Sequence, residues 1–400
     1  MLVISLVLIA FTYLNNAGYV IQSSAEDRSF DAEYYLSELA TLPNEFASVR
    51  DYLQKISRTY GGEKGFIMLR EGVLPSGMDI HLLGHAIGDV LYNQEGIEGM
   101  QYCTHEFRNA CSHSIVIGGL LEHGMGIFDH IHEACARAPG GTGAYTMCFH
   151  GFGHGVLAFT DYDLPQAIEI CKKAGTAEYG FQEYHQCVGG VIMELHSGVH
   201  DEAVWRENAK QYIDFENPTQ MCERDYIEEG AKRMCYAYIS PYIFDAAGWR
   251  FGNLTDEVVE NSFAICSEVP SEFYRMVCSA NLGKEFIVLA ENRDIRNMED
   301  ISDRAVQQSI HWCSLALDKS VESVCVQEIV NSLYWGGENH YSASLRFCAQ
   351  VNDRSVRDDC FMRLFGNVSY YRDESTYWQE LCEAVPNDVN QACLSAAANG

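Results

Sequence analysis

The sequence contains no Cys-x-x-Cys pair, although 16 of its 400 residues are cysteines. This absence excludes zinc ribbons, thioredoxin-like redox centres and haem attachment through Cys-x-x-Cys-His. Basic residues are scarce too: the chain has 27 lysines and arginines against 56 acidic residues, which gives a formal net charge of -29. Because such a surface repels phosphate backbones, we expect no nucleic-acid partner.

The common catalytic signatures are missing as well. The chain has no Gly-x-Ser-x-Gly elbow, no P-loop and no dinucleotide-binding fingerprint. His105-Glu106 and His132-Glu133 both lack the second histidine that the zinc-protease motif His-Glu-x-x-His requires. A protease of that class is therefore excluded.

Long apolar runs are absent except at the N-terminus. Residues 1–11 form a run that is too short to cross a bilayer comfortably but has the length of a signal-peptide core. Ser23-Ser24-Ala25 has the small-residue spacing that signal peptidase accepts, although the basic residues that usually precede the run are missing. We therefore predict a signal peptide at residues 1–25. The alternative is an uncleaved N-terminal anchor, which would be the sole membrane contact. The rest of the chain is expected to be extracytoplasmic, either secreted or periplasmic.

The cysteines fall into sequential couples, and six of the eight couples have ten to twelve residues between them. The couples are Cys103 with Cys111, Cys135 with Cys148, Cys171 with Cys187, Cys222 with Cys235, Cys266 with Cys278, Cys313 with Cys325, Cys348 with Cys360 and Cys382 with Cys393. Twelve residues along a straight helix span about 18 Å, whereas disulfide-bonded Cα atoms lie about 4.4–6.8 Å apart. If each couple is a disulfide, the chain turns back inside it. Pairing between units is the alternative.

The residues around the cysteines predict helices. Turn formers lie inside the couples, for example Pro270-Ser271 and Asp318-Lys319-Ser320. After the second cysteine comes an apolar stripe with helical spacing, such as Val326, Ile329, Val330 and Leu333. We predict an all-α fold in which disulfide-stapled helical hairpins repeat and stack as an α-solenoid-like array.

The array is expected to have three parts after the signal segment. Residues 26–72 have the pattern of one or two amphipathic helices and form an N-terminal cap. Residues 73–200 are rich in histidine and glycine, and residues 201–400 contain regular Cys-paired hairpins.

Twelve of the fourteen histidines lie between residues 81 and 200. Two of them begin the same pattern, His-x-x-Gly-His, at His81 and at His150. Alignment of the units on their second cysteines places His113 opposite His150. Residues i and i+4 share one helix face, and equivalent positions of stacked repeats lie side by side. We therefore expect His81, His85, His113, His150 and His154 to line one groove and to bind a metal.

The remaining polar candidates are weaker. His105, His123, His130, His132, His185, His196 and His200 are expected to be exposed or structural. Asp89, Glu106, Glu122, Tyr184 and Glu194 are candidates for groups that support the ligands or transfer protons. The glycines beside the histidines indicate either close helix packing or room for a ligand.

The strings that begin at Cys148 and Cys187 resemble those of an uncharacterised family of exported microbial proteins with C-x-H-G-x-G-H-G and C-x-G-G-V-x-M-E motifs. The resemblance covers roughly residues 75–200 and implies neither an activity nor a substrate. The paired helices are similar to TPR or Sel1-like repeats in outline only, because the signature residues of those repeats are absent.

Two functions remain open from the sequence. With the cysteines bridged, the available ligands are imidazole, carboxylate and the Met193 thioether, which suit copper or zinc and, less well, non-haem iron or haem. The first hypothesis is an exported metal-binding helical-repeat protein, in its finer form a copper- or zinc-dependent redox or hydrolytic enzyme. The alternative is a non-catalytic extracytoplasmic scaffold that binds a protein partner.

Overall fold

The computed structural model describes residues 30–399 apart from residues 44, 75–79, 105, 196–206, 208, 250–253, 291–300, 335–338 and 372–374. The predicted signal peptide or anchor at residues 1–25 lies outside the described residues. Within the described part, the regular structure is entirely helical and contains no strand, so the predicted all-α class is confirmed. In that part, no helix combines the length and the apolar character that a membrane span needs.

One helix of each unit stacks on the equivalent helix of the next, and together they form a continuous ladder. The ladder helices are α5 (Ile80–Glu95), α6 (Ala110–His123), α8 (Gly141–Phe159), α10 (Gln182–Glu194), α12 (Glu229–Tyr238), α15 (Glu272–Ala290), α17 (Lys319–Tyr334), α19 (Arg354–Tyr371) and α21 (Asn387–Asn399). The stacking of α10 on α12 continues across the predicted boundary near residue 200. A division of labour between the two halves stays a prediction.

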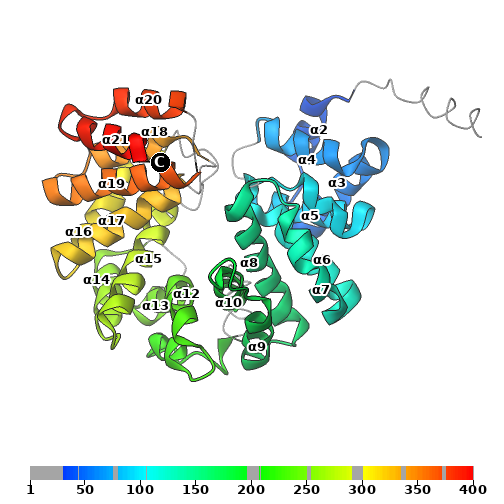
Figure 1. The fold of residues 1–400 in the computed structure, drawn as a ribbon, viewed down its shortest axis with the longest axis horizontal. Helices are drawn as coiled ribbons and strands as arrows, with labels where there is room; N and C mark the ends of the chain where they lie inside the picture. The colour runs from blue at the N-terminus through cyan, green and yellow to red at the C-terminus, as the bar shows by residue number, and fades with distance from the viewer. Residues whose placement is uncertain are drawn as a thin grey trace, which may run out of the picture.

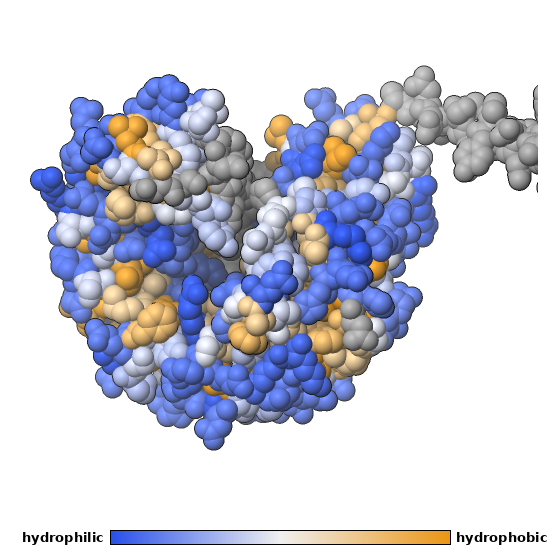
Figure 2. Space-filling model, viewed as in Figure 1, coloured by the Kyte–Doolittle hydropathy of each residue, from blue (hydrophilic) through white to orange (hydrophobic). Residues whose placement is uncertain are grey.

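The other helices pack against the ladder. They are α7 (Phe128–Ala136), α9 (Leu164–Ala174), α13 (Ser240–Ala246), α14 (Asp256–Ser267), α16 (Asp303–Ser314), α18 (Tyr341–Ala349), α20 (Ser375–Ala384) and the 3-10 helices η2 (Gly96–Tyr102), η3 (Glu106–Asn109), η4 (Gly124–Ile127) and η5 (Pro218–Glu223). The array curves into an open arc, with α7, α14 and α16 on its outer side (Figure 1). The face in Figure 2 is mostly hydrophilic with scattered apolar patches, as the acidic composition requires.

All eight predicted cysteine couples are disulfides, with Cα–Cα distances from 5.4 to 5.7 Å. The bonds join Cys103 to Cys111, Cys135 to Cys148, Cys171 to Cys187, Cys222 to Cys235, Cys266 to Cys278, Cys313 to Cys325, Cys348 to Cys360 and Cys382 to Cys393. No cysteine is left free, so pairing between units is excluded and no thiol is available as a ligand. So many disulfides indicate an oxidising environment outside the cytoplasm.

Two of the bridged units depart from the expected α-hairpin. Cys103 follows the 3-10 helix η2, and its partner Cys111 lies in the first turn of α6. Cys222 lies on the 3-10 helix η5, and its partner Cys235 lies on α12. In both units the second arm is the predicted α-helix, and only the first arm differs.

The unit formed by α16 and α17 shows why the chain turns inside a couple. The Asp318 carboxylate accepts hydrogen bonds from the backbone N–H groups of Ser320 and Val321, and so caps the first turn of α17. The predicted stripe from Val326 to Leu333 is buried against the neighbouring ladder helices. Local capping and the apolar stripe therefore produce the hairpin that the disulfide closes.

The N-terminal cap contains three helices, α2 (Ala32–Leu39), α3 (Phe46–Tyr60) and α4 (Gly62–Glu71), rather than the one or two predicted. Gly61 ends α3 as expected, with a φ of +89° that favours glycine. The chain then starts a new helix at once, because Phe66 and Leu69 of α4 are buried in the core.

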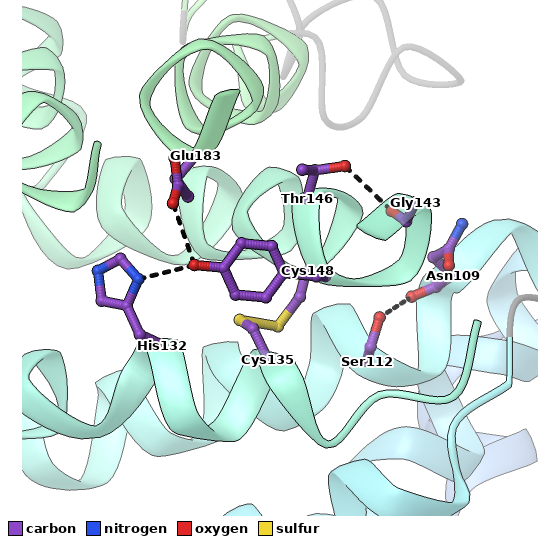
Figure 3. The surroundings of a disulfide bond; sticks show 9 residues. Asn109, Ser112, His132, Cys135, Gly143, Thr146, Cys148 and Glu183 are labelled. Carbon is purple, nitrogen blue, oxygen red and sulfur yellow. Dashed lines mark hydrogen bonds between the residues drawn. A yellow bond between two sulfur atoms is a disulfide. The ribbon is translucent and has the colours of Figure 1, made fainter. Parts of the chain in front are cut away.

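A buried carboxylate ties three helices together beside the disulfide between Cys135 and Cys148 (Figure 3). Glu183 of α10 is fully buried and accepts hydrogen bonds from the Tyr145 hydroxyl of α8 at 3.0 Å and from the backbone N–H of Thr176 at 3.3 Å. Because the Tyr145 hydroxyl donates its proton to Glu183, it accepts the bond from His132 Nδ1 of α7, at 2.9 Å. His132 is thus structural, as expected from the sequence.

Replacing Glu183 with alanine is expected to lower the free energy of unfolding by about 3 kcal/mol, because the buried Tyr145 hydroxyl and the half-buried Thr176 would lose the carboxylate that accepts their hydrogen bonds. Denaturant unfolding followed by circular dichroism measures this loss. Glu183→Gln, which retains an acceptor oxygen, should lose less. Equal unfolding midpoints for the alanine variant and the native chain would show that Glu183 does not hold these helices together.

Candidate metal centre

Five histidines from three successive ladder helices converge. His81 and His85 lie on α5, His113 lies on α6, and His150 and His154 lie on α8. The ring centre of His113 is 6.2 and 6.0 Å from those of His81 and His85. It is 5.5 and 5.8 Å from those of His150 and His154. The predicted set therefore does come together, with His113 at its centre.

The first triangle consists of His81, His85 and His113. One nitrogen of each ring lies within 4.8 Å of the other two, which makes this triangle a candidate metal site in the described part of the chain. Two nitrogens bound tetrahedrally to one zinc ion at about 2.0 Å are about 3.3 Å apart. The Nε2 atoms of His81 and His85 are already 3.2 Å apart.

The proton positions on His81 and His85 follow from their partners. His81 Nδ1 lies 3.0 Å from the carbonyl oxygen of Phe107, which can only accept, so Nδ1 carries the proton and Nε2 carries the lone pair. His85 Nε2–H then donates to His81 Nε2, and His85 Nδ1 accepts from the Ser114 hydroxyl at 2.9 Å. A metal ion between the two Nε2 atoms would need only a change of tautomer at His85.

The oxygens of Phe107 and Ser114 thus orient two imidazoles. A histidine that binds a metal usually donates its other ring N–H to a carbonyl, hydroxyl or carboxylate, which fixes the ring and its tautomer. Neither oxygen was singled out in the sequence. Ser114 follows His113 directly on α6, while the Phe107 carbonyl is brought to His81 by the turn before α6.

That turn has an unusual backbone. Phe107, Arg108 and Asn109 have φ values of 61°, 56° and 60°, in the left-handed region that L-residues avoid. Such conformations cost about 1–3 kcal/mol each and persist where the surrounding structure holds them in place. Here the turn delivers a carbonyl to His81 immediately before α6 begins.

His113 has no hydrogen bond at either ring nitrogen, although only 2% of its surface is exposed. An unpaired buried polar atom costs about 1–3 kcal/mol, so a buried ring with two of them calls for an explanation. An ion bound to the ring supplies one.

His150 and His154 form the other side of the cluster. His150 is also 2% exposed, its Nδ1 has no hydrogen-bond partner, and its ring lies 5.0 Å from that of Tyr238 on α12. His154 Nδ1 lies 2.8 Å from Glu194 of α10, which also accepts a hydrogen bond from the Tyr162 hydroxyl. Glu194 therefore lies where a group that supports a His154 ligand would lie, and that role stays a prediction.

Burial keeps the inner imidazoles neutral. Desolvation is the main reason why the pKa values of His85, His113 and His150 lie well below the ordinary value of 6.5. Neighbouring histidines lower these pKa values further, because each positive charge would repel the next. Neutral imidazole is the form that binds metal ions.

The packing of two glycines fixes the register between α5 and α8. A Cβ atom at Gly88 would lie 2.4 Å from the carbonyl oxygen of Cys111, and one at Gly153 would lie 2.0 Å from that of Cys187. Each glycine therefore packs against the backbone of the second cysteine of the following unit, and the two glycines occupy equivalent positions.

This register corrects the alignment of the two His-x-x-Gly-His strings. His85 and His150 each precede their glycine by three residues, so they are counterparts, and His113 lies next to both. His81 lies one turn before this shared position, whereas His154 lies one turn after it. The two strings look alike in the sequence but cover different turns of their helices.

Close helix contact explains most of the glycines, which the sequence left open. A Cβ atom at Gly84 would lie 2.5 Å from Cβ of Phe107, and one at Gly151 would lie 2.6 Å from Cα of His113. Gly189 is closely packed as well, since its Cβ atom would lie 2.9 Å from Cε2 of Tyr238, 3.0 Å from Cε of Met234 and 3.3 Å from His150 Nδ1, the unpaired nitrogen.

The other candidate supporting groups have partners elsewhere or no hydrogen-bond partner. Asp89 accepts a hydrogen bond from Asn93, and Glu122 accepts one from Tyr92. Glu106 Oε2 and the Tyr184 hydroxyl are buried without a hydrogen-bond partner. The predictions for these four residues gain no support from the geometry.

Among the histidines set aside in the sequence, His123 and His130 are exposed, as expected. His185 is half-buried near Gly230, and burial lowers its pKa. His105, His196 and His200 lie outside the described residues.

The donor set of the first triangle is three neutral imidazoles held by oxygen partners. Zinc sites that retain an open coordination position have such a set, and imidazole also suits copper. No protein-family model matches this chain, and no curated protein or solved structure is significantly similar to it.

Proposed function

We propose that this is an exported metalloprotein whose His81, His85 and His113 bind one zinc or copper ion. The observation that supports the proposal most strongly is the convergence of three imidazole nitrogens within 4.8 Å. Two of the rings are oriented by oxygen partners, and the third is buried with no other hydrogen bond.

Three protein ligands leave a fourth position for water or a substrate. His81 is partly exposed, so solvent reaches this side of the cluster. Three neutral ligands would not offset the charge of a divalent ion, so an ion held by these residues would lower the pKa of a bound water molecule. We infer a metal-dependent hydrolytic or redox activity as the finer form of the proposal.

The test is metal binding by the oxidised mature chain without a polyhistidine tag. We expect about one equivalent of zinc to bind tightly to the native chain, and His85→Ala to lose affinity by at least about 100-fold. Ser114→Ala, which removes only the orienting hydroxyl, should lose about 10–100-fold. Competition with a chromophoric chelator measures all three.

His130→Ala is the matched control, since it removes an exposed histidine of α7 and should leave affinity unchanged. Less than a tenth of an equivalent of zinc or copper on the native chain would overturn the proposal. The scaffold alternative predicts that outcome.

A further inference from the structure

We propose a second metal position at His150 and His154, with His113 shared between the two ions. This inference rests on the proposed function, because His113 is also a ligand of the first ion. It assigns a role to the second nitrogen of His113 and to the three helices that meet at this point.

The ring spacing of the second triangle is compatible with a metal position once the rings turn their nitrogens inward, whereas among the described residues the nitrogens already meet within 4.8 Å only in the first triangle. Two imidazoles bound tetrahedrally to one ion at about 2.0 Å have ring centres about 5 Å apart. In the second triangle the distances are 5.0 Å between His150 and His154, and 5.5 and 5.8 Å from these rings to His113. In the first triangle the distance from His81 to His85 is 4.6 Å, and those to His113 are longer, at 6.2 and 6.0 Å.

Free nitrogens are available in this triangle. His150 Nδ1 and both nitrogens of His113 are buried and have no hydrogen-bond partner. Rotating the His113 ring about χ2 would therefore break no hydrogen bond. His154 Nδ1 is hydrogen-bonded to Glu194, so Nε2 of His154 is the ligand atom. This pairing is the carboxylate–histidine arrangement found at metal sites.

His113 is the only ring that lies against both pairs in the described structure. When the second ion binds, the remaining N–H proton of His113 leaves to solvent and a metal–nitrogen bond forms in its place. The ring then bridges the two ions as an imidazolate, which holds them about 6 Å apart.

The charges around the second position predict the order of binding. Glu194 provides a negative charge behind His154. Lys284 of α15 lies over the Tyr238 ring at 4.4 Å, and its positive charge acts on His150. Glu194 offsets the charge of Lys284, but the first ion about 6 Å away also repels a second cation, so the second equivalent should bind more weakly than the first.

Copper(II) titration followed by electron paramagnetic resonance tests the inference. In the native chain the integrated spin signal should rise to about one equivalent and then fall as the second equivalent binds, because an imidazolate bridge couples the two spins. His154→Ala should bind one equivalent with a full signal. Glu194→Gln, which retains every ligand, should weaken only the second equivalent, by about 10–100-fold.

Three results separate the possibilities. A native chain that binds one equivalent, lost in His85→Ala and unchanged in His154→Ala, would overturn the second position and leave the proposed function standing. Two equivalents with two full spins would overturn the sharing of His113. A native chain that binds no copper and no zinc would overturn the proposed function itself.

Discussion

Alanine in place of Gly190 is expected to destabilise the protein by about 3 kcal/mol or more. Its Cβ atom would lie 1.9 Å from the carbonyl oxygen of His150. That oxygen belongs to the backbone of α8, so no side-chain rotation can make room, and α10 would have to move away. The unfolding midpoint in denaturant, followed by circular dichroism, measures the loss.

Gly366 of α19 provides a control of opposite sign. No heavy atom lies within 4 Å of the Cβ position there, and the residue is exposed within a helix. Gly366→Ala should therefore raise the free energy of unfolding by about 1 kcal/mol, through helix propensity alone. Equal midpoints for Gly190→Ala and the native chain would mean that α8 and α10 do not cross as closely as the structure places them.

The fold could be predicted from the cysteines because a disulfide is a strict distance constraint. Couples such as Cys313 and Cys325 cannot be bridged along one helix, and the residues between them cap and turn. The pattern failed at Cys103 and Cys222, where the first arm is a 3-10 helix, because cysteine spacing does not distinguish the two kinds of helix.

The convergence of the five histidines could also be predicted, but their register could not. In α8 the aligned position holds Cys148, whereas α5 holds Leu83 in that place and offers no cysteine to align. The similarity of the His-x-x-Gly-His strings then suggested a register that is one turn away from the one fixed by Gly88 and Gly153.

The oxygen atoms that bond to the histidines of the site could not be predicted from the sequence. The Phe107 carbonyl reaches His81 through three left-handed residues, none of which is a glycine that would mark such a turn. Glu183 is one of 56 acidic residues, and only tertiary packing distinguishes it as a fully buried one that holds α10 to α8.

The metal-free protein is expected to lose stability steeply as the pH falls below about 6.5. Burial lowers the pKa values of His85, His113 and His150 in the folded chain, whereas the same side chains titrate near 6.5 when unfolded. Below that pH the unfolded chain binds more protons, so acid favours unfolding. Their contribution is fully present above pH 6.5 and is lost as the pH falls toward the lowered values.

With three such groups, the free energy of unfolding should change by at most about 4 kcal/mol per pH unit. Denaturant unfolding at pH values from 7.5 to 5.5 measures this slope. His113→Leu should make the slope about one third shallower, because the unfolded variant can bind only two of the three extra protons. His130→Ala, which removes an exposed histidine of α7, is the control for the loss of a histidine outside the cluster. Bound zinc should delay the loss to lower pH, since protons then have to displace the ion. A flat stability profile between pH 6.5 and 5.5 would show that the three imidazoles are solvated rather than buried, and the case for a metal ion on an unpaired His113 would fail with it.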